Sequence, residues 1–252
     1  MTADVDVAAR AVRAGAEAAL AAAREGGLDV ETKLSPADLV SRADTAAEQA
    51  IASILRAERP HDGLLGEEGA SAPGDGRRRW VVDAIDGTFN FLSGIPHWCV
   101  AVGLEDDGEP TTAAVYDPSA DELFLAAPGH PTTVNDAPAR VRTGRTLRQA
   151  GVATYLREDK SRDRETWLAR LVDHTGVVRA GGAGTLELAW VAAGRVDAWA
   201  QPNVSAWDWV PGAALVRHAG GVATVLEGEP AWHLAGPEQL VAELASLVPR
   251  ER

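Results

Sequence analysis

The segment that most constrains this fold covers residues 80–91, where three apolar residues lead directly into Asp83 and Asp86. The apolar run predicts a buried strand. Two carboxylates held close together at the end of such a strand repel each other unless a proton or a cation lies between them. Because Mg²⁺ prefers carboxylate oxygens, the segment favours a magnesium site. Aspartate is also a common cap for turns and helices, and the spacing alone leaves that alternative open.

Gly87 and Thr88 follow the second aspartate and add a second chemical function to the same turn. Backbone N–H groups in a glycine-containing turn are able to bind the oxygens of a phosphate group. The Thr88 hydroxyl is able to orient a water molecule. Together with the carboxylates, this turn favours a phosphate bound beside a metal ion.

Further acidic residues stand apart from this segment in the sequence. Glu67 and Glu68 follow Gly66, and in isolation such a pair is typical of a solvated surface. Asp208 stands at the start of a predicted apolar helix, where it is equally typical of an N-cap. Each of these residues taken alone leaves the structural alternative open, so it is their combination that carries the interpretation.

In combination these motifs resemble the inositol monophosphatase family, a lithium-sensitive group of magnesium-dependent sugar-phosphate phosphatases. The matching motifs are, in chain order, Asp38-Leu39-Val40-Ser41 with Asp44, Gly66-Glu67-Glu68, Asp83-Ala84-Ile85-Asp86-Gly87-Thr88 with Asn90-Phe91, and Trp207-Asp208 leading into Ala219-Gly220-Gly221. The resemblance extends from Lys33 to Gly221. It implies an α+β fold with a layered α-β-α-β-α sugar-phosphatase architecture.

The resemblance also implies a role for individual residues. The metal ligands that it implies are Glu67, Asp83, the main-chain carbonyl of Ile85, Asp86 and Asp208, which would hold about two or three Mg²⁺ ions. The catalytic residues that it implies are Glu67, Asp44 and Thr88, which would act on the attacking water. The substrate contacts that it implies are Lys33, Asp86, Gly87, Thr88, Gly184, Thr185 and Gln201.

Two positions depart from the family pattern. Ala84 stands where the family usually has proline, so the turn loses some rigidity but no ligand. Gln201, seven residues before Asp208, stands where inositol-specific members commonly carry a substrate-binding glutamate. The identity of the substrate is therefore open at this point.

Several phosphate esters are candidates for the substrate. We rank an inositol phosphate or a similar polyol phosphate first and histidinol phosphate second, because the chain lacks an evident basic pocket for a second phosphate. A fructose bisphosphate or an adenosine 3′,5′-bisphosphate ranks lower for the same reason. The alternatives from other classes are a noncatalytic regulatory or scaffold protein that keeps the fold, and a metal-buffering module.

The charge of the chain limits its partners. Its formal net charge is −13, which argues against nonspecific binding to nucleic acid or to an anionic membrane. This charge repels an anionic substrate such as a small phosphate ester, so a bound cation has to reverse the sign locally. Cys99 is the only cysteine, which excludes an internal disulfide and a thiolate zinc cluster.

Hydrophobic periodicity predicts a mixed α and β chain. Helices are predicted at residues 5–24, 44–59, 166–173, 185–193, 209–218 and 238–247. Strands are predicted at residues 80–82, 98–104, 111–116, 122–126, 151–154, 196–200 and 222–225. We expect residues 1–252 to form a single inositol monophosphatase-like unit, with two subdomains that meet near residues 141–150. The sequence has no secretory or membrane-spanning pattern, so we expect a cytoplasmic location, and the resemblance implies a homodimer.

Overall fold

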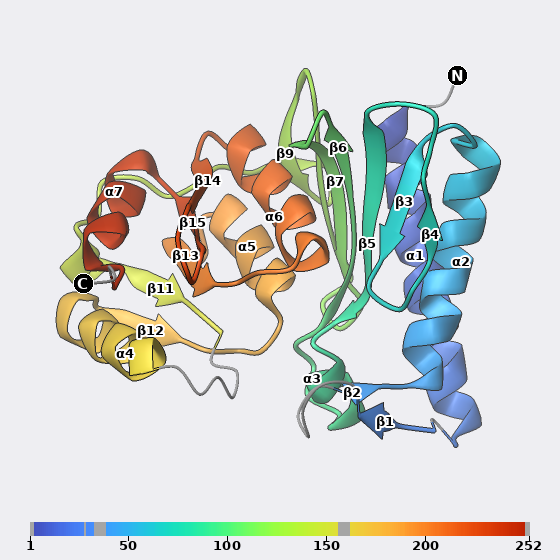
Figure 1. Ribbon diagram of the computed structural model, residues 1–252, viewed down its shortest axis with the longest axis horizontal. Coiled ribbons are helices and arrows are strands. Elements are labelled where there is room, and N and C mark those ends of the chain that lie inside the picture. The colour runs from blue at the N-terminus through green and yellow to red at the C-terminus, as the bar shows by residue number, and fades with distance from the viewer. Residues whose placement is uncertain (1–2, 28, 33–38, 156–161, 250–252) are drawn as a thin grey trace.

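The computed structural model describes residues 3–27, 29–32, 39–155 and 162–249, and in it helical layers alternate with sheets (Figure 1). The helices α1 and α2 cover one face of a large sheet, and α5 and α6 cover its other face. A smaller sheet lies beyond α5 and α6, and α4 and α7 form the last layer. This arrangement confirms the predicted α+β fold with the layered α-β-α-β-α architecture.

The outer layer consists of α1 (Asp4–Glu25) and α2 (Arg42–Glu58), where the sequence predicted helices. Both helices bury mainly alanines, so they pack closely against each other and against the large sheet. α2 begins at a capping box, in which Ser41 and Asp44 exchange hydrogen bonds between side chain and backbone. Ser41 therefore caps α2.

The large sheet has the strand order β10-β9-β8-β7-β6-β5-β3-β4. Its strands are β3 (Gly63–Gly66), β4 (Ser71–Ala72), β5 (Arg78–Asp86), β6 (Cys99–Asp106), β7 (Glu109–Asp117), β8 (Glu122–Ala127), β9 (His130–Val134) and β10 (Ala137–Pro138). β3 and β5 are parallel, and their neighbours pair antiparallel. Trp80 and Val82 pack on the side of α1 and α2, whereas Val81 packs on the side of α5 and α6. β5 is thus buried on both faces, which explains its continuous apolar run.

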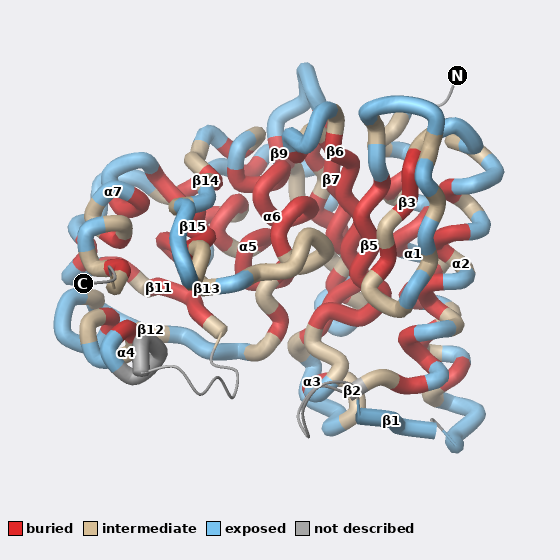
Figure 2. The backbone as a smooth tube through the Cα atoms, in the orientation of Figure 1, coloured by how far each residue is buried: buried red, intermediate tan, exposed pale blue. Residues whose placement is uncertain are grey.

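The smaller sheet has the strand order β12-β11-β13-β15-β14. Its strands are β11 (Gly151–Ala153), β12 (Val177–Arg179), β13 (Ala198–Pro202), β14 (Val222–Leu226) and β15 (Trp232–Gly236). The remaining elements are β1 (Glu31–Thr32), β2 (Leu39–Val40), α3 (Thr88–Leu92), the 3-10 turn η1 (Leu147–Gln149), α4 (Arg162–His174), α5 (Gly184–Ala192), α6 (Ala206–His218) and α7 (Glu238–Leu247). α5 and α6 are buried on nearly all sides because both sheets cover them (Figure 2).

One hydrophobic cluster joins the two sheets through α5 and α6. It contains Val81 and Cys99 from the large sheet and Trp199 and Ala235 from the smaller one. Residues 139–150 connect the sheets along the chain. Because the cluster is shared, we propose that the chain forms a single unit. Within the described ranges, no helix is long and apolar enough to cross a membrane.

Candidate active site

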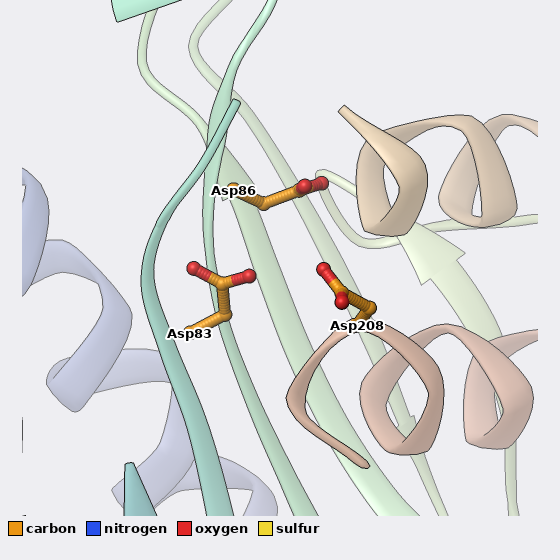
Figure 3. A group of neighbouring side chains, drawn as sticks. All are labelled: Asp83, Asp86 and Asp208. Carbon is orange, nitrogen blue, oxygen red and sulfur yellow. The ribbon is translucent and has the colours of Figure 1, made fainter. Parts of the chain in front are cut away.

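Three aspartates from two elements converge where β5 ends and α6 begins (Figure 3). Asp83 and Asp86 lie on β5, and Asp208 lies in the first turn of α6. One carboxylate oxygen from each residue lies within 4.8 Å of the others. Residues three apart on a regular strand point to opposite faces, but the register with β6 shifts between Asp83 and Asp86. This irregularity lets both carboxylates approach Asp208.

The electrostatics of the cluster suit a divalent cation. Burial raises the pKa of Asp83 well above its ordinary value, and the charges of Glu67, Asp86 and Asp208 raise it further. The Asp83 Oδ1 atom is buried without a hydrogen-bond partner. Burial also raises the pKa of Asp86 to about 6. A cation between these groups would favour their ionised forms. A ligand set made up entirely of oxygen atoms suits Mg²⁺.

Asp86 also closes the N-terminus of α5. The backbone N–H groups of Gly184, Thr185 and Leu186 donate to its carboxylate at 3.1, 2.7 and 3.2 Å. The local N-cap residue, Ala183, has no side-chain acceptor, so Asp86 supplies one from another part of the chain. Asp86 is therefore a helix cap as well as a member of the acidic cluster. The predicted contacts of Gly184 and Thr185 with substrate stay predictions.

Asp44 and Thr88 meet beside the cluster. The Thr88 Oγ1 atom lies 3.1 Å from Asp44 Oδ1 and 3.0 Å from the main-chain oxygen of Ile85. The hydroxyl has a single hydrogen, so it donates fully to only one of these acceptors at a time. Asp44 is held from the other side by the backbone N–H and the hydroxyl of Ser41, at 2.8 and 2.7 Å. Burial raises the pKa of Asp44, and these hydrogen bonds lower it.

Glu67 and Gly87 lie in the turns that follow β3 and β5. Since these strands are parallel neighbours, both turns lie at the same edge of the sheet. The Glu67 N–H donates to the Val82 carbonyl at 3.2 Å, and the Glu67 charge raises the pKa of Asp83. Gly87 has a φ of 92°, and a Cβ there would lie 3.1 Å from the Ala183 Cβ. The tight turn into α3 therefore requires glycine.

The remaining predicted residues lie around this centre or outside the described ranges. Gln201 lies on β13, and its Oε1 atom is 3.8 Å from the position that a Cβ on Gly184 would occupy. Its side chain thus reaches the N-terminus of α5. Asp208 is the third residue of α6 and not its N-cap residue, which is Ser205. Lys33 lies outside the described residues.

Sequence reasoning did not single out Glu48, a buried acid near this centre. It lies on α2 and is 4% exposed. Its carboxylate accepts the backbone N–H groups of Glu68 and Ala70 at 2.8 and 2.7 Å. A signal was present, because Glu48 follows Asp44 by four residues and such residues share one face of a helix.

Comparisons with known proteins agree with the geometry. The model of a family described as the inositol monophosphatase family matches residues 1–249. An inositol-1-monophosphatase of Rhizobium meliloti (strain 1021) is 38% identical over 224 residues, which cover 85% of this chain and 84% of that protein. A protein of Xylella fastidiosa named Nus factor SuhB is 37% identical over 213 residues, covering 81% and 77%. The crystal structure of extragenic suppressor protein suhB from Bartonella henselae superposes with a TM-score of 0.90 at 34% identity, covering 100% of both chains.

Proposed function

The chain belongs to the inositol monophosphatase family and is a phosphatase, and from this premise we propose that it is a magnesium-dependent phosphomonoesterase of small polyol or sugar phosphates. Inositol monophosphate is the first candidate substrate. The observation that carries the proposal is the convergence of Asp83, Asp86 and Asp208 within 4.8 Å. Burying carboxylates so close together is unfavourable unless a cation offsets their charge.

We assign the metal-holding role to five groups at this centre. They are the side chains of Glu67, Asp83, Asp86 and Asp208 and the main-chain carbonyl of Ile85. When bound, Mg²⁺ supplies the positive charge that lowers the pKa of a water molecule and offsets the charge on the leaving oxygen. All five groups offer oxygen, which a hard cation requires.

The residues beside the metal ligands have their own tasks in this proposal. When the Thr88 hydroxyl donates its hydrogen bond to Asp44, its oxygen is free to accept a hydrogen bond from a water molecule. Glu67, in the adjacent turn, accepts a hydrogen bond from the second hydrogen of the same water. These groups orient the water toward phosphorus, and the backbone N–H groups of Gly87 and Thr88 bind the phosphate oxygens.

The leaving alcohol would lie near the N-terminus of α5. Gln201 reaches this position from β13, and its amide is able both to donate to and to accept from hydroxyl groups. The hydroxyl groups of a polyol are able to accept a hydrogen bond from the amide NH₂ group and to donate one to the amide oxygen. This supports a polyhydroxylated leaving group, with Gly184, Thr185 and Lys33 as the further proposed contacts.

Phosphate release from a substrate panel tests the proposal. The panel contains inositol 1-phosphate, histidinol phosphate, fructose 1,6-bisphosphate and adenosine 3′,5′-bisphosphate, each with and without Mg²⁺, and with Li⁺ as a probe. We expect magnesium-dependent release with a clear preference for inositol 1-phosphate. A preference for histidinol phosphate would support the proposed hydrolysis but would make histidinol phosphate, not inositol phosphate, the substrate.

A second candidate function is a noncatalytic regulatory role. The observation that favours it is the name Nus factor SuhB, which relatives of comparable identity carry. Mg²⁺ binding without phosphate release from any member of the panel would favour this candidate. We also keep a cytoplasmic location and a homodimer as predictions, to be checked by fractionation and by light scattering.

A further inference from the structure

The turn that carries Glu67 is held by a carboxylate from another element. This turn covers residues 66–70 and follows β3. The carboxylate is that of Glu48, which lies on α2 and is 4% exposed. Its Oε2 atom accepts the Glu68 N–H at 2.8 Å, and its Oε1 atom accepts the Ala70 N–H at 2.7 Å. The two bonds therefore fix the chain on the C-terminal side of Glu67.

The close approach of Glu48 depends on glycine at position 66. A Cβ on Gly66 would lie 2.1 Å from the Glu48 Oε2 atom, which is far inside a contact distance. Gly66 does not have a positive φ, so the need for glycine comes from this contact rather than from the backbone conformation. A larger residue at position 66 would therefore displace the Glu48 carboxylate from the turn.

Two backbone hydrogen bonds complete the support of the turn. The Gly66 N–H donates to the Ala70 carbonyl at 2.7 Å, and the Glu67 N–H donates to the Val82 carbonyl of β5 at 3.2 Å. Val82 immediately precedes Asp83. The backbone of Glu67 is therefore tied to β5 on one side and, through its neighbours, to Glu48 on the other.

The position of Glu48 on α2 connects this turn to the other catalytic groups. Asp44 lies one helical turn earlier and contacts the Thr88 hydroxyl at 3.1 Å. One helix thus contacts both Thr88 and the Glu67 turn. α2 is packed on α1 and on the large sheet, so it holds Thr88 and the Glu67 turn at fixed positions relative to each other.

From these contacts we propose that Glu48 is a positioning residue, which holds Glu67 at the distance from Asp83 that the metal site requires. The inference rests on the proposed function for its effect on turnover. Glu48 contacts no reacting atom and acts only through the backbone of the turn. Charged hydrogen-bond acceptors of this kind typically change metal affinity or activity about 10- to 100-fold when they are removed.

The test compares Glu48→Gln with Asp197→Asn in the full chain. Both substitutions replace a buried carboxylate that accepts two hydrogen bonds. Asp197 immediately precedes β13 of the smaller sheet and accepts hydrogen bonds from the Gly151 N–H and from Arg145. The measurements are Mg²⁺ affinity by calorimetry, kcat and KM on the best substrate of the panel, and thermal unfolding in EDTA. We expect Glu48→Gln to weaken Mg²⁺ binding and to lower kcat, each about 10- to 100-fold, with KM within about twofold. We expect Asp197→Asn to lower only the unfolding temperature.

A different result would overturn the inference. If Glu48→Gln behaves as Asp197→Asn does, with Mg²⁺ affinity and kcat within about twofold of the natural chain, Glu48 is only structural. If Glu48→Gln does not fold, Glu48→Asp takes its place, because it keeps the charge and withdraws it from the turn by one methylene. A natural chain that binds Mg²⁺ but releases no phosphate would contradict the proposed function, and the Mg²⁺ titrations would still decide the role of Glu48.

Discussion

Lowering the pH from 7 to 5 should weaken Mg²⁺ binding to this protein, because protons and the cation compete for the same carboxylates. Burial raises the pKa of Asp86 from 3.8 to about 6. About one Asp86 side chain in ten is therefore ionised at pH 5, against about nine in ten at pH 7. Since a ligand has to be deprotonated to bind a metal, this difference alone lowers the Mg²⁺ affinity about tenfold. The pKa of Asp83 is also raised, which acts in the same direction.

The same titration affects the stability of the metal-free protein. The folded-state pKa of Asp86 lies above its ordinary value, so its stabilising contribution is complete below about pH 3.8 and is lost as the pH rises through about 6. Between pH 5 and pH 7.5, this loss amounts to about 1.4 kcal/mol of unfolding free energy. Bound Mg²⁺ should offset it, so the stabilisation by Mg²⁺ should grow over this pH range.

Calorimetric titration of Mg²⁺ at pH 5, 6 and 7 checks this prediction. Buffers of different ionisation enthalpy report the released protons, and we expect about one proton per binding event at pH 5 from Asp86. Asp107→Asn is the control, because Asp107 is an exposed partner of Arg77 and should leave the affinity unchanged at every pH. A Mg²⁺ affinity that is the same at pH 5 and pH 7, without proton release, would refute the reasoning.

Three further predictions concern single residues of the site. Asp83→Asn should lower phosphate release at least about 1,000-fold. Its stability to unfolding in EDTA should be equal or higher, because a buried charge is removed. Substantial activity in the folded variant would count against the assignment. Thr88→Val should lower kcat about 100-fold in steady-state kinetics and Thr88→Ser much less, since only the hydroxyl is needed; equal kcat values would exclude this role. Gly66→Ala should weaken Mg²⁺ binding by displacing Glu48. Gly76→Ala is the control, because the space around its Cβ position is open, and it should leave Mg²⁺ binding unchanged. Calorimetric Mg²⁺ titration of both variants tests this prediction.

The sequence predicted the long elements of the fold and missed several short ones. Residues 5–24 and 44–59 carry apolar residues at helical spacing over several turns, and both are helices in the structure. β3 (Gly63–Gly66) and β15 (Trp232–Gly236) were missed. β3 has two glycines in four residues, and β15 ends in Ala235 and Gly236, so neither has the composition of a strand. Their pairing with distant strands stabilises them, and that pairing is not visible in local sequence.

The acidic residues of the site and their shared metal were expected from the motifs and the family resemblance, but the strand irregularity that brings Asp83 and Asp86 together was not. A regular β5 would place Asp83 and Asp86 on opposite faces, and only the register shift between them brings their carboxylates together. Such an irregularity depends on the neighbouring strand β6 and leaves no pattern in the local sequence. The capping of α5 by Asp86 was missed for a similar reason, because the two lie about one hundred residues apart.

The donors around the cluster explain how the fold tolerates so much buried negative charge. Asp44, Asp86 and Glu48 accept hydrogen bonds from backbone N–H groups and hydroxyls. Such donors fix a carboxylate in place but leave its negative charge available, whereas a lysine or arginine at the same place would compete with a cation. The chain as a whole is also acidic, so an incoming phosphate meets repulsion until cations are bound. With the proposed function, we therefore expect metal binding to precede or accompany substrate binding, and substrate affinity measured in EDTA to be much weaker than in Mg²⁺.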